Sequence, residues 1–259
     1  MTPASPLRPA LTADLSGKTI LVTGASRGFG RAFVRLLASM GAEVIAAARS
    51  ADALDGLVTE IAREGGRAHA LSMDVSNSGS IEAAFAHIPK VDVLVNNAGI
   101  GGTARALKTS PDQWREVYAT NVDGAFAVAC AAANRMIETG TGGSIINIAS
   151  ITGIRPGVAV PAYSSSKSAV IGMTRALAGE WARYGIRVNA IAPGYFATDL
   201  SGEFLESDYG KAMQGRIPMR RFGELHELAG PLLLLASDAS SFMSGAVIEV
   251  DGGHLCAPL

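Results

Sequence analysis

The stretch "LVTGASRGFGRAF" at residues 21–33 decides the fold of this chain. It starts with apolar residues typical of a strand, passes through Gly24, Gly28 and Gly30, and continues into a helix-forming sequence. Small residues let such a loop turn tightly and approach a pyrophosphate, which the free N–H groups and partial positive charge of the helix start attract. A plain strand-to-helix turn has the same local pattern, so the interpretation depends on the rest of the chain.

Apolar runs followed by helical stretches recur along the whole sequence. The expected strands are 19–24, 43–48, 68–75, 91–97, 144–150, 186–194 and 246–253, and the expected helices are 28–40, 51–64, 78–87, 111–138, 161–184 and 224–237. Most of these strands are continuously apolar, which is typical of parallel strands buried on both faces. The sequence predicts a single-domain α/β fold of the Rossmann type, a doubly wound parallel sheet of about seven strands with helices on both faces.

Two segments fall outside this alternation. Residues 1–14 contain three prolines and are expected to form a flexible N-terminal tail before one dinucleotide-binding domain at 15–259. Residues 195–216 are the longest irregular piece, and a segment of this length in a compact domain is usually functional. We expect it to be a mobile lid over a substrate or an irregular helical excursion.

Composition argues against several classes of protein. The net charge of −1 gives no strong field toward nucleic acid or an anionic membrane, and no apolar run is long enough to cross a bilayer. Two cysteines, Cys130 and Cys256, and four dispersed histidines predict neither a disulfide framework nor a metal site. We expect a cytoplasmic protein without metal, nucleic-acid or membrane partners.

The end of the second expected strand bears on the choice of dinucleotide. A carboxylate at this place selects the free 2′-hydroxyl of the adenosine ribose, but here the sequence has Ala48 followed by Arg49. Arg27 lies inside the glycine loop. Two guanidinium groups and no acid suit a 2′-phosphate, because planar forks bind phosphate bidentately. The sequence therefore predicts a preference for NADP(H), with NAD(H) possible.

Tyr163 and Lys167 stand one helical turn apart in "PAYSSSKSAV", residues 161–170. Hydride reduction of a carbonyl leaves negative charge on oxygen, which needs a hydrogen-bond donor and then a proton. A tyrosine supplies both, and a nearby ammonium lowers the pKa of the phenol from its ordinary value of about 10. We expect Lys167 to act in this way on Tyr163, because side chains four residues apart on a helix are neighbours.

Short motifs in a fixed order give the chain its resemblance to a known family. They are "TGASRGFG", "MDV", "NNAG", "TNVDG", "INIAS", "YSSSK", "IRVNAIAPGYFATD" and "VDGG". Together they span about residues 15–253, and in this order they resemble the compact single-domain form of the short-chain dehydrogenase/reductase family.

The resemblance implies residue roles. The implied catalytic residues are Asn121, Ser150, Tyr163 and Lys167, with Asn121 acting through a water. The implied cofactor-binding residues are Gly24, Ser26, Arg27, Gly28, Phe29, Gly30, Arg49, Asp74, Val75, Asn96, Ala98, Gly99, Tyr163, Lys167, Pro193, Gly194 and Thr198. The implied substrate pocket contains Ile151, Thr152, Val158, Tyr195 and Phe196. Structural explanations stay open for four of these residues: Asp74 as a helix-entry residue, Asn96 as a strand end, Asn121 as a helix kink and Ser150 as a strand-end cap.

The substrate is less constrained than the reaction. The resemblance lies nearest to 3-oxoacyl-carrier-protein reductases and sugar or polyol dehydrogenases. No arginine cluster in 195–216 announces an anionic substrate, and few basic residues suit an acidic carrier protein. We therefore expect a carbonyl reductase or alcohol dehydrogenase for a small ketone or alcohol.

Three alternatives stay open: an NAD-dependent sugar or polyol dehydrogenase, a 3-oxoacyl-carrier-protein reductase, and a non-catalytic protein that senses the cofactor. Alanine-rich helices such as "AFAVACAAA" suggest burial against a second subunit as well as the sheet. The resemblance implies a homotetramer, or else a homodimer.

Overall fold

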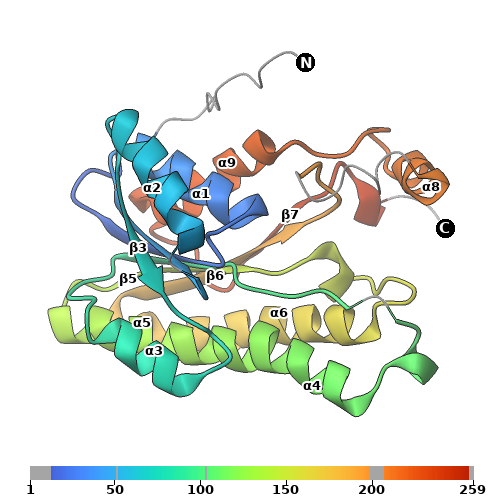
Figure 1. Ribbon diagram of the computed structural model, residues 1–259, viewed down its shortest axis with the longest axis horizontal. Coiled ribbons are helices and arrows are strands. Elements are labelled where there is room, and N and C mark those ends of the chain that lie inside the picture. The colour runs from blue at the N-terminus through green and yellow to red at the C-terminus, as the bar shows by residue number, and fades with distance from the viewer. Residues whose placement is uncertain (1–12, 51, 103, 199–206, 257–259) are drawn as a thin grey trace.

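The computed structural model describes residues 13–50, 52–102, 104–198 and 207–256. Its centre is one parallel sheet in the order β3-β2-β1-β4-β5-β6-β7 (Figure 1). The strands are β1 Thr19–Thr23, β2 Glu43–Ala48, β3 Arg67–Ser72, β4 Val93–Asn96, β5 Gly143–Ile148, β6 Ile186–Pro193 and β7 Val247–Val250. The predicted seven-stranded doubly wound fold is confirmed, and most strands are a few residues shorter than expected.

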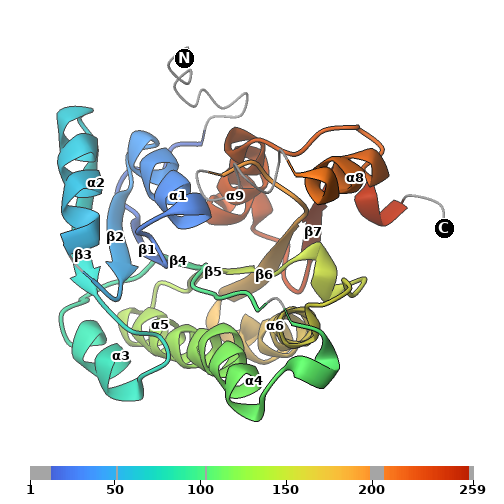
Figure 2. The same ribbon diagram turned by 45° about the vertical axis from the view of Figure 1, so that its right-hand side comes forward.

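Helices cover both faces of the sheet (Figures 1 and 2). One layer contains α1 Gly28–Ser39, α2 Asp52–Arg63 and α9 Ala229–Ala236, and the other contains α3 Ser78–Phe85, α4 Pro111–Tyr118, α5 Ala125–Thr139 and α6 Pro161–Trp181. Consecutive residues of β1 point to opposite layers, with Ile20 and Val22 in the first core cluster and Leu21 in the second. This two-sided burial is why the strands are continuously apolar.

The expected helix at 111–138 is divided. A π-helical turn, η2 (Ala119–Gly124), separates α4 from α5. A Cβ at Gly124 would lie 2.5 Å from the carbonyl oxygen of Val75, so this turn passes very close to the backbone after β3. The sequence pattern records the apolar face of the helix but not this close approach, and a single uninterrupted helix was therefore wrong.

The segments around the sheet differ in part from expectation. The expected helix at 224–237 is a 3₁₀ turn, η5 (Leu225–Leu228), followed by α9. In the irregular segment at 195–216, residues 208–216 form the helix α8 (Asp208–Arg216), while 199–206 lie outside the described residues. Most of the expected tail at 1–14 is also outside them, and the domain boundary stays a prediction.

Candidate active site

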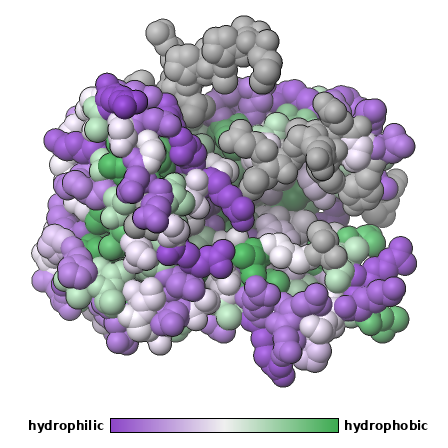
Figure 3. All heavy atoms as spheres, in the orientation of Figure 1, coloured by the Kyte–Doolittle hydropathy of each residue, from purple (hydrophilic) through white to green (hydrophobic). Residues whose placement is uncertain are grey.

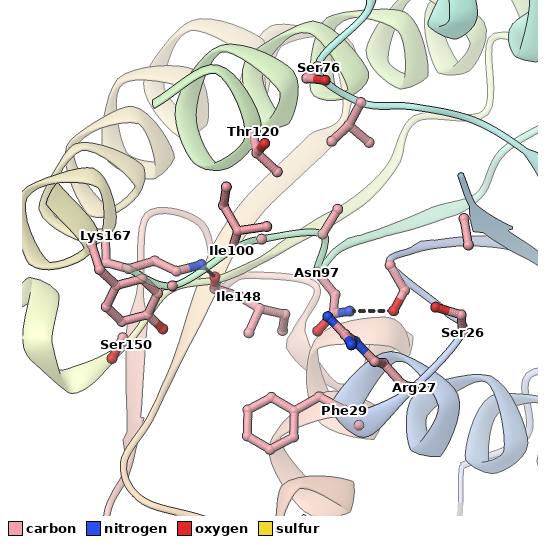
Figure 4. Close-up of a pocket in the computed structure, with 18 of the residues that line it drawn as sticks. Ser26, Arg27, Phe29, Ser76, Asn97, Ile100, Thr120, Ile148, Ser150 and Lys167 are labelled. Atoms are coloured by element: carbon pink, nitrogen blue, oxygen red, sulfur yellow. Dashed lines mark hydrogen bonds between the residues drawn. The ribbon is translucent and has the colours of Figure 1, made fainter. Parts of the chain in front are cut away.

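A cleft of about 570 Å³ opens at the carboxyl ends of the central strands. This face of the molecule is hollowed, with polar side chains along part of the rim (Figure 3). Most predicted site residues line the cleft: Gly24, Ser26, Arg27, Gly28, Phe29, Arg49, Asp74, Val75, Ala98, Gly99, Ser150, Tyr163, Lys167, Pro193, Gly194 and Thr198. Ser26 and Arg27 lie toward one end, and Ser150 and Lys167 lie toward the other (Figure 4).

The glycine loop forms a cradle that side chains would fill. Gly24 has φ +65°, and a Cβ there would lie 2.9 Å from the Cα of Ala98. A Cβ at Gly30 would lie 2.2 Å from the carbonyl oxygen of Gly24, so Gly30 serves the packing of α1 and does not line the cleft. Arg27 is the N-cap of α1 and gives it no side-chain cap, which leaves the first amides of the helix to bind an anionic group. These features fit the pyrophosphate of a dinucleotide.

Asn97 fixes the distance between β1 and β4 at the floor of the cleft. Its Nδ2 donates to the carbonyl oxygens of Thr23 (2.9 Å) and Gly24 (3.3 Å), and its backbone N–H donates to Oγ1 of Thr23 (2.9 Å). Figure 4 shows its side chain turned to the glycine loop. Asn97 was not among the predicted site residues, although it is the second asparagine of the "NNAG" motif.

Asn96 instead lies beneath the cleft wall. Its side chain is buried and donates to the carbonyl oxygen of Ala125 (2.7 Å) and to Oδ1 of Asn147 (3.3 Å). The structure therefore gives Asn96 a structural role in joining β4 to β5 and α5, and it does not place the residue where adenosine contacts were expected.

Two guanidinium groups border the cofactor end of the cleft. Arg27 and Arg49 are both exposed, and in the described part of the chain neither has a carboxylate within ion-pair distance. Asp74 accepts hydrogen bonds from the hydroxyl (2.7 Å) and the backbone N–H (2.9 Å) of Ser76. These bonds, with a smaller effect of Arg49, lower the pKa of Asp74. The acid therefore stays ionised near neutral pH.

Tyr163 and Lys167 lie on α6, which begins with Pro161 at its first turn. Lys167 Nζ is 5.7 Å from the centroid of the Tyr163 ring and donates to the carbonyl oxygen of Ile148 (2.7 Å). Burial lowers the pKa of Lys167 to about 8. Ser150 lies two residues after the end of β5, and its Oγ accepts from the backbone N–H (3.2 Å) and hydroxyl (3.0 Å) of Thr152.

The pKa of Tyr163 differs in direction from the sequence prediction. Burial raises it, a hydrogen bond with Ser150 acts in the opposite direction, and Tyr195 adds to the rise. The chain's own residues therefore do not make the phenol acidic, because removing water from the phenolate outweighs its polar neighbours. The positive charge of a bound oxidised nicotinamide would act in the opposite direction and lower the pKa of Tyr163.

Asn121 lies in the π-helical turn and holds two segments together. Its Oδ1 accepts from the backbone N–H of Ile100 (2.8 Å), and its Nδ2 donates to the Ile100 carbonyl oxygen (2.9 Å) and to Ser166 Oγ (3.0 Å). A Cβ at Gly99 would lie 3.2 Å from Asn121 Oδ1 and 3.5 Å from Lys167 Nζ, so this glycine lets both polar atoms lie close to its backbone. Asn121 therefore lies where the expected helix at 111–138 is interrupted, and its catalytic role through a water stays a prediction.

None of the five expected substrate residues is among those that line the cleft. Ile151 is buried, Thr152 bonds to Ser150, and Val158 is 85% exposed. Tyr195 and Phe196 line a second cavity of about 340 Å³ beside β7. Phe196 also packs edge-on against Phe29 of the glycine loop, with ring centroids 5.6 Å apart.

Two kinds of site are not found in the part of the chain that the structure describes. It has no cluster of three or more His, Cys, Asp or Glu side chains that could hold a metal ion. Nor does any described helix have the length and hydropathy needed to cross a membrane.

The parallel sheet, the glycine loop and the start of α1 without a side-chain cap define a dinucleotide-binding α/β protein. Residues 18–208 match the model of the short chain dehydrogenase family. The chain is 39% identical to 2-dehydro-3-deoxy-D-gluconate 5-dehydrogenase of Dickeya dadantii, over 94% of this chain and 98% of that protein. It is 40% identical to galactitol 2-dehydrogenase (L-tagatose-forming) of Cereibacter sphaeroides, over 93% and 96% respectively.

A solved structure gives the same result. The gluconate 5-dehydrogenase of Burkholderia cenocepacia, in complex with NADP and tartrate, is similar with a TM-score of 0.89 and 36% identity, over 94% of this chain and 97% of that one. The chain belongs to the short-chain dehydrogenase family and is an NAD(P)-dependent oxidoreductase.

Proposed function

We propose that this protein transfers a hydride between NADP(H) and a small carbonyl or secondary alcohol compound of the sugar and polyol type. The observation that carries the proposal is the single cleft that joins the glycine loop at the start of α1 to Tyr163 and Lys167 on α6. The bound dinucleotide would supply or accept the hydride. The side chains of the protein manage the proton and the charge on the substrate oxygen.

Tyr163 is the proposed proton donor in reduction and the proton acceptor in oxidation. In reduction its raised pKa keeps the proton on the phenol until negative charge develops on the substrate oxygen. Ser150 offers a second hydrogen bond to that oxygen, and Lys167 contributes its charge and a contact to the nicotinamide ribose. Asn121 positions this group through Ile100 and Ser166.

The preference for NADP(H) is supported by Arg27 and Arg49, which border the cleft without carboxylate partners among the described residues. Neighbouring guanidinium groups on α1 are already paired: Arg31 with Glu60 (2.7 Å) and Arg35 with the same carboxylate (2.7 Å). Charge pairing therefore distinguishes the two residues expected to bind a 2′-phosphate from those that fasten α1 to α2.

The substrate class is supported by the relatives, whose names include a sugar-acid dehydrogenase and a polyol dehydrogenase. The test is a panel of ketones, polyols and sugar acids with NADPH and NADP⁺, followed by the absorbance of the reduced nicotinamide. Turnover of a hydroxylated substrate that disappears in Tyr163→Phe would support the proposal. Full activity of Tyr163→Phe would overturn it.

We further propose that the protein assembles as a homotetramer in the cytoplasm. Apolar side chains stand exposed on the outer helices, with Trp114 on α4 38% exposed and Phe126 and Ile137 on α5 47% and 39% exposed. Large apolar side chains gathered on outer helices are typical of subunit contacts. Light scattering that gave the mass of one chain would contradict the assembly.

A further inference from the structure

Four segments far apart in the sequence meet at a corner beside Tyr195. The loop after the 3₁₀ turn η3 (Ile151–Gly153) brings Arg155, the end of α8 brings Arg216, and the 3₁₀ turn η7 (His254–Cys256) brings His254. Figures 1 and 2 both show the C-terminal turn next to α8. We call Arg155, Tyr195, Arg216 and His254 the Arg155 corner.

Direct contacts hold the corner together. The rings of Tyr195 and His254 stack with centroids 5.6 Å apart and planes inclined by 27°. Arg155 Nη2 donates to the carbonyl oxygen of His254 at 2.6 Å. The loop that carries Arg155 is itself fixed, because a Cβ at Gly153 would lie only 2.7 Å from the carbonyl carbon of Lys167. The position of Arg155 therefore follows from that of α6, the helix that holds the catalytic tyrosine.

The charge of the corner is positive. Arg155 and Arg216 are both exposed, and neither has a carboxylate within ion-pair distance in the described ranges of the chain. The nearby acid is Asp251, which accepts from the backbone N–H groups of Gly253 (2.8 Å) and Leu255 (2.7 Å) and so closes the C-terminal turn.

His254 contributes shape to the corner more than charge. Burial lowers its pKa, Arg155 and Arg216 lower it further, and Asp251 acts in the opposite direction. Its ring is therefore neutral at pH 7, and its buried Nδ1 has no hydrogen-bond partner among the described residues. The two guanidinium groups carry the positive charge.

The corner is close to the reacting groups. Pro193 and Gly194, which directly precede Tyr195, line the same cleft as Tyr163, and Tyr195 contributes to the raised pKa of the Tyr163 phenol. Arg155 follows Ser150 by one 3₁₀ turn and two residues. Arg155 is not among the residues that line the cleft, so a substrate whose oxygen bonds to Tyr163 and Ser150 would have to extend past η3 to reach its guanidinium group.

We propose that Arg155, supported by His254 and Arg216, binds the carboxylate of an anionic hydroxy-acid or keto-acid substrate while the reacting carbon lies beside Tyr163. This inference rests on the proposed function and narrows it to acids. It departs from the neutral ketone or alcohol that the sequence favoured, because the arginines that matter are not clustered in 195–216 but meet through the fold. A guanidinium suits this role because its N–H fork matches the geometry of a carboxylate.

The test compares acids with their uncharged counterparts. The NADP⁺ complex of the full chain is titrated in a calorimeter with three matched pairs: D-gluconate and D-glucitol, D-galactonate and galactitol, and D-xylonate and xylitol. The acid of at least one pair should bind about ten-fold or more tightly than its polyol, as expected for a hydrogen bond to a charged group. Arg155→Gln should remove this preference and Arg155→Lys should keep part of it, while both retain the melting temperature and the affinity for NADPH.

Arg183→Gln is the matched control, since Arg183 is also exposed. It lies before β6, at the opposite end of that strand from Tyr195, and donates a hydrogen bond to the hydroxyl of Tyr184. It should bind all six compounds as the wild type does. Equal binding of acid and polyol in every pair, binding of none, or an unchanged preference in Arg155→Gln would overturn the inference. Turnover assays on the same pairs separate the two proposals. Acid-selective binding without turnover would refute the proposed function alone, whereas turnover of polyols without selectivity would refute the acid site alone.

Discussion

The cofactor preference gives the sharpest quantitative prediction. Arg49→Ala removes one of the two guanidinium groups that border the cleft without carboxylate partners among the described residues. A hydrogen bond to a charged group contributes about 1.5–3 kcal/mol, and the exposure of Arg49 favours the lower end. A loss of about 1.5 kcal/mol corresponds to roughly ten-fold. The kcat/KM for NADPH should therefore fall about ten-fold, while that for NADH changes little.

The assay measures initial rates with both cofactors at saturating substrate for the wild type, Arg27→Ala, Arg49→Ala and the double variant. The double variant should lose between ten- and a hundred-fold, since the two residues share one phosphate and need not act additively. Arg31→Ala is the control, because Arg31 also lies on α1 but is paired with Glu60 at 2.7 Å. Equal kcat/KM for NADPH and NADH in the wild type, or an unchanged NADPH value in Arg49→Ala, would refute the reasoning.

Three further predictions follow from the site. Tyr163→Phe should reduce kcat by about 10²–10⁴ and leave the Kd for NADPH, measured by fluorescence titration, nearly unchanged; a loss of binding as large as the loss of rate would contradict the role of the phenol. Burial lowers the pKa of Lys167 to about 8 in the folded state. Below that pH the folded protein holds a buried positive charge, which lowers its free energy of unfolding. As the pH rises from about 8 toward the ordinary lysine pKa of the unfolded chain, the folded state loses this charge first and the free energy of unfolding increases. Between pH 8 and 9.5 the wild type should gain roughly 2 kcal/mol of unfolding free energy relative to Lys167→Met in urea titrations, and parallel pH profiles would disprove the shift. Gly30→Ala should destabilise the protein by about 1–3 kcal/mol in thermal melts, because its Cβ would lie 2.2 Å from the Gly24 carbonyl oxygen. Gly56→Ala is the control: it lies on the exposed face of α2, where a Cβ meets no atom within 4 Å, and it should be neutral or stabilising.

The sequence was informative where the determining contacts are local. The glycine loop, the alternation of strands and helices and the one-turn spacing of Tyr163 and Lys167 depend on neighbouring residues. The structure has the predicted parallel sheet and brings the glycine loop, Tyr163 and Lys167 to one cleft. Features that depend on distant contacts were not predicted. Asn97 has its role through Thr23, 74 residues earlier, and Arg155 meets His254 across 99 residues.

Burial caused the remaining differences. The pKa of Tyr163 depends on how completely the folded chain removes water from the phenol, and a one-turn spacing carries no such information. Likewise, the division of the helix at 111–138 depends on the backbone of Val75 passing beside Gly124. The apolar pattern of the helix is the same with or without that contact.

The close approach of Gly153 to the backbone of Lys167 has a practical consequence for protein engineering. Gly153 is held against α6 and so to the chemistry, and Arg155 is tied to the same turn, because its backbone N–H donates to the carbonyl oxygen of Ile151 (2.9 Å). Residues 156–160 then lead back to α6 at Pro161, and these five positions form an exchangeable cassette. Grafting the corresponding stretch from a relative should redirect substrate choice without retuning the proton-transfer machinery, provided that Gly153 upstream of it is kept.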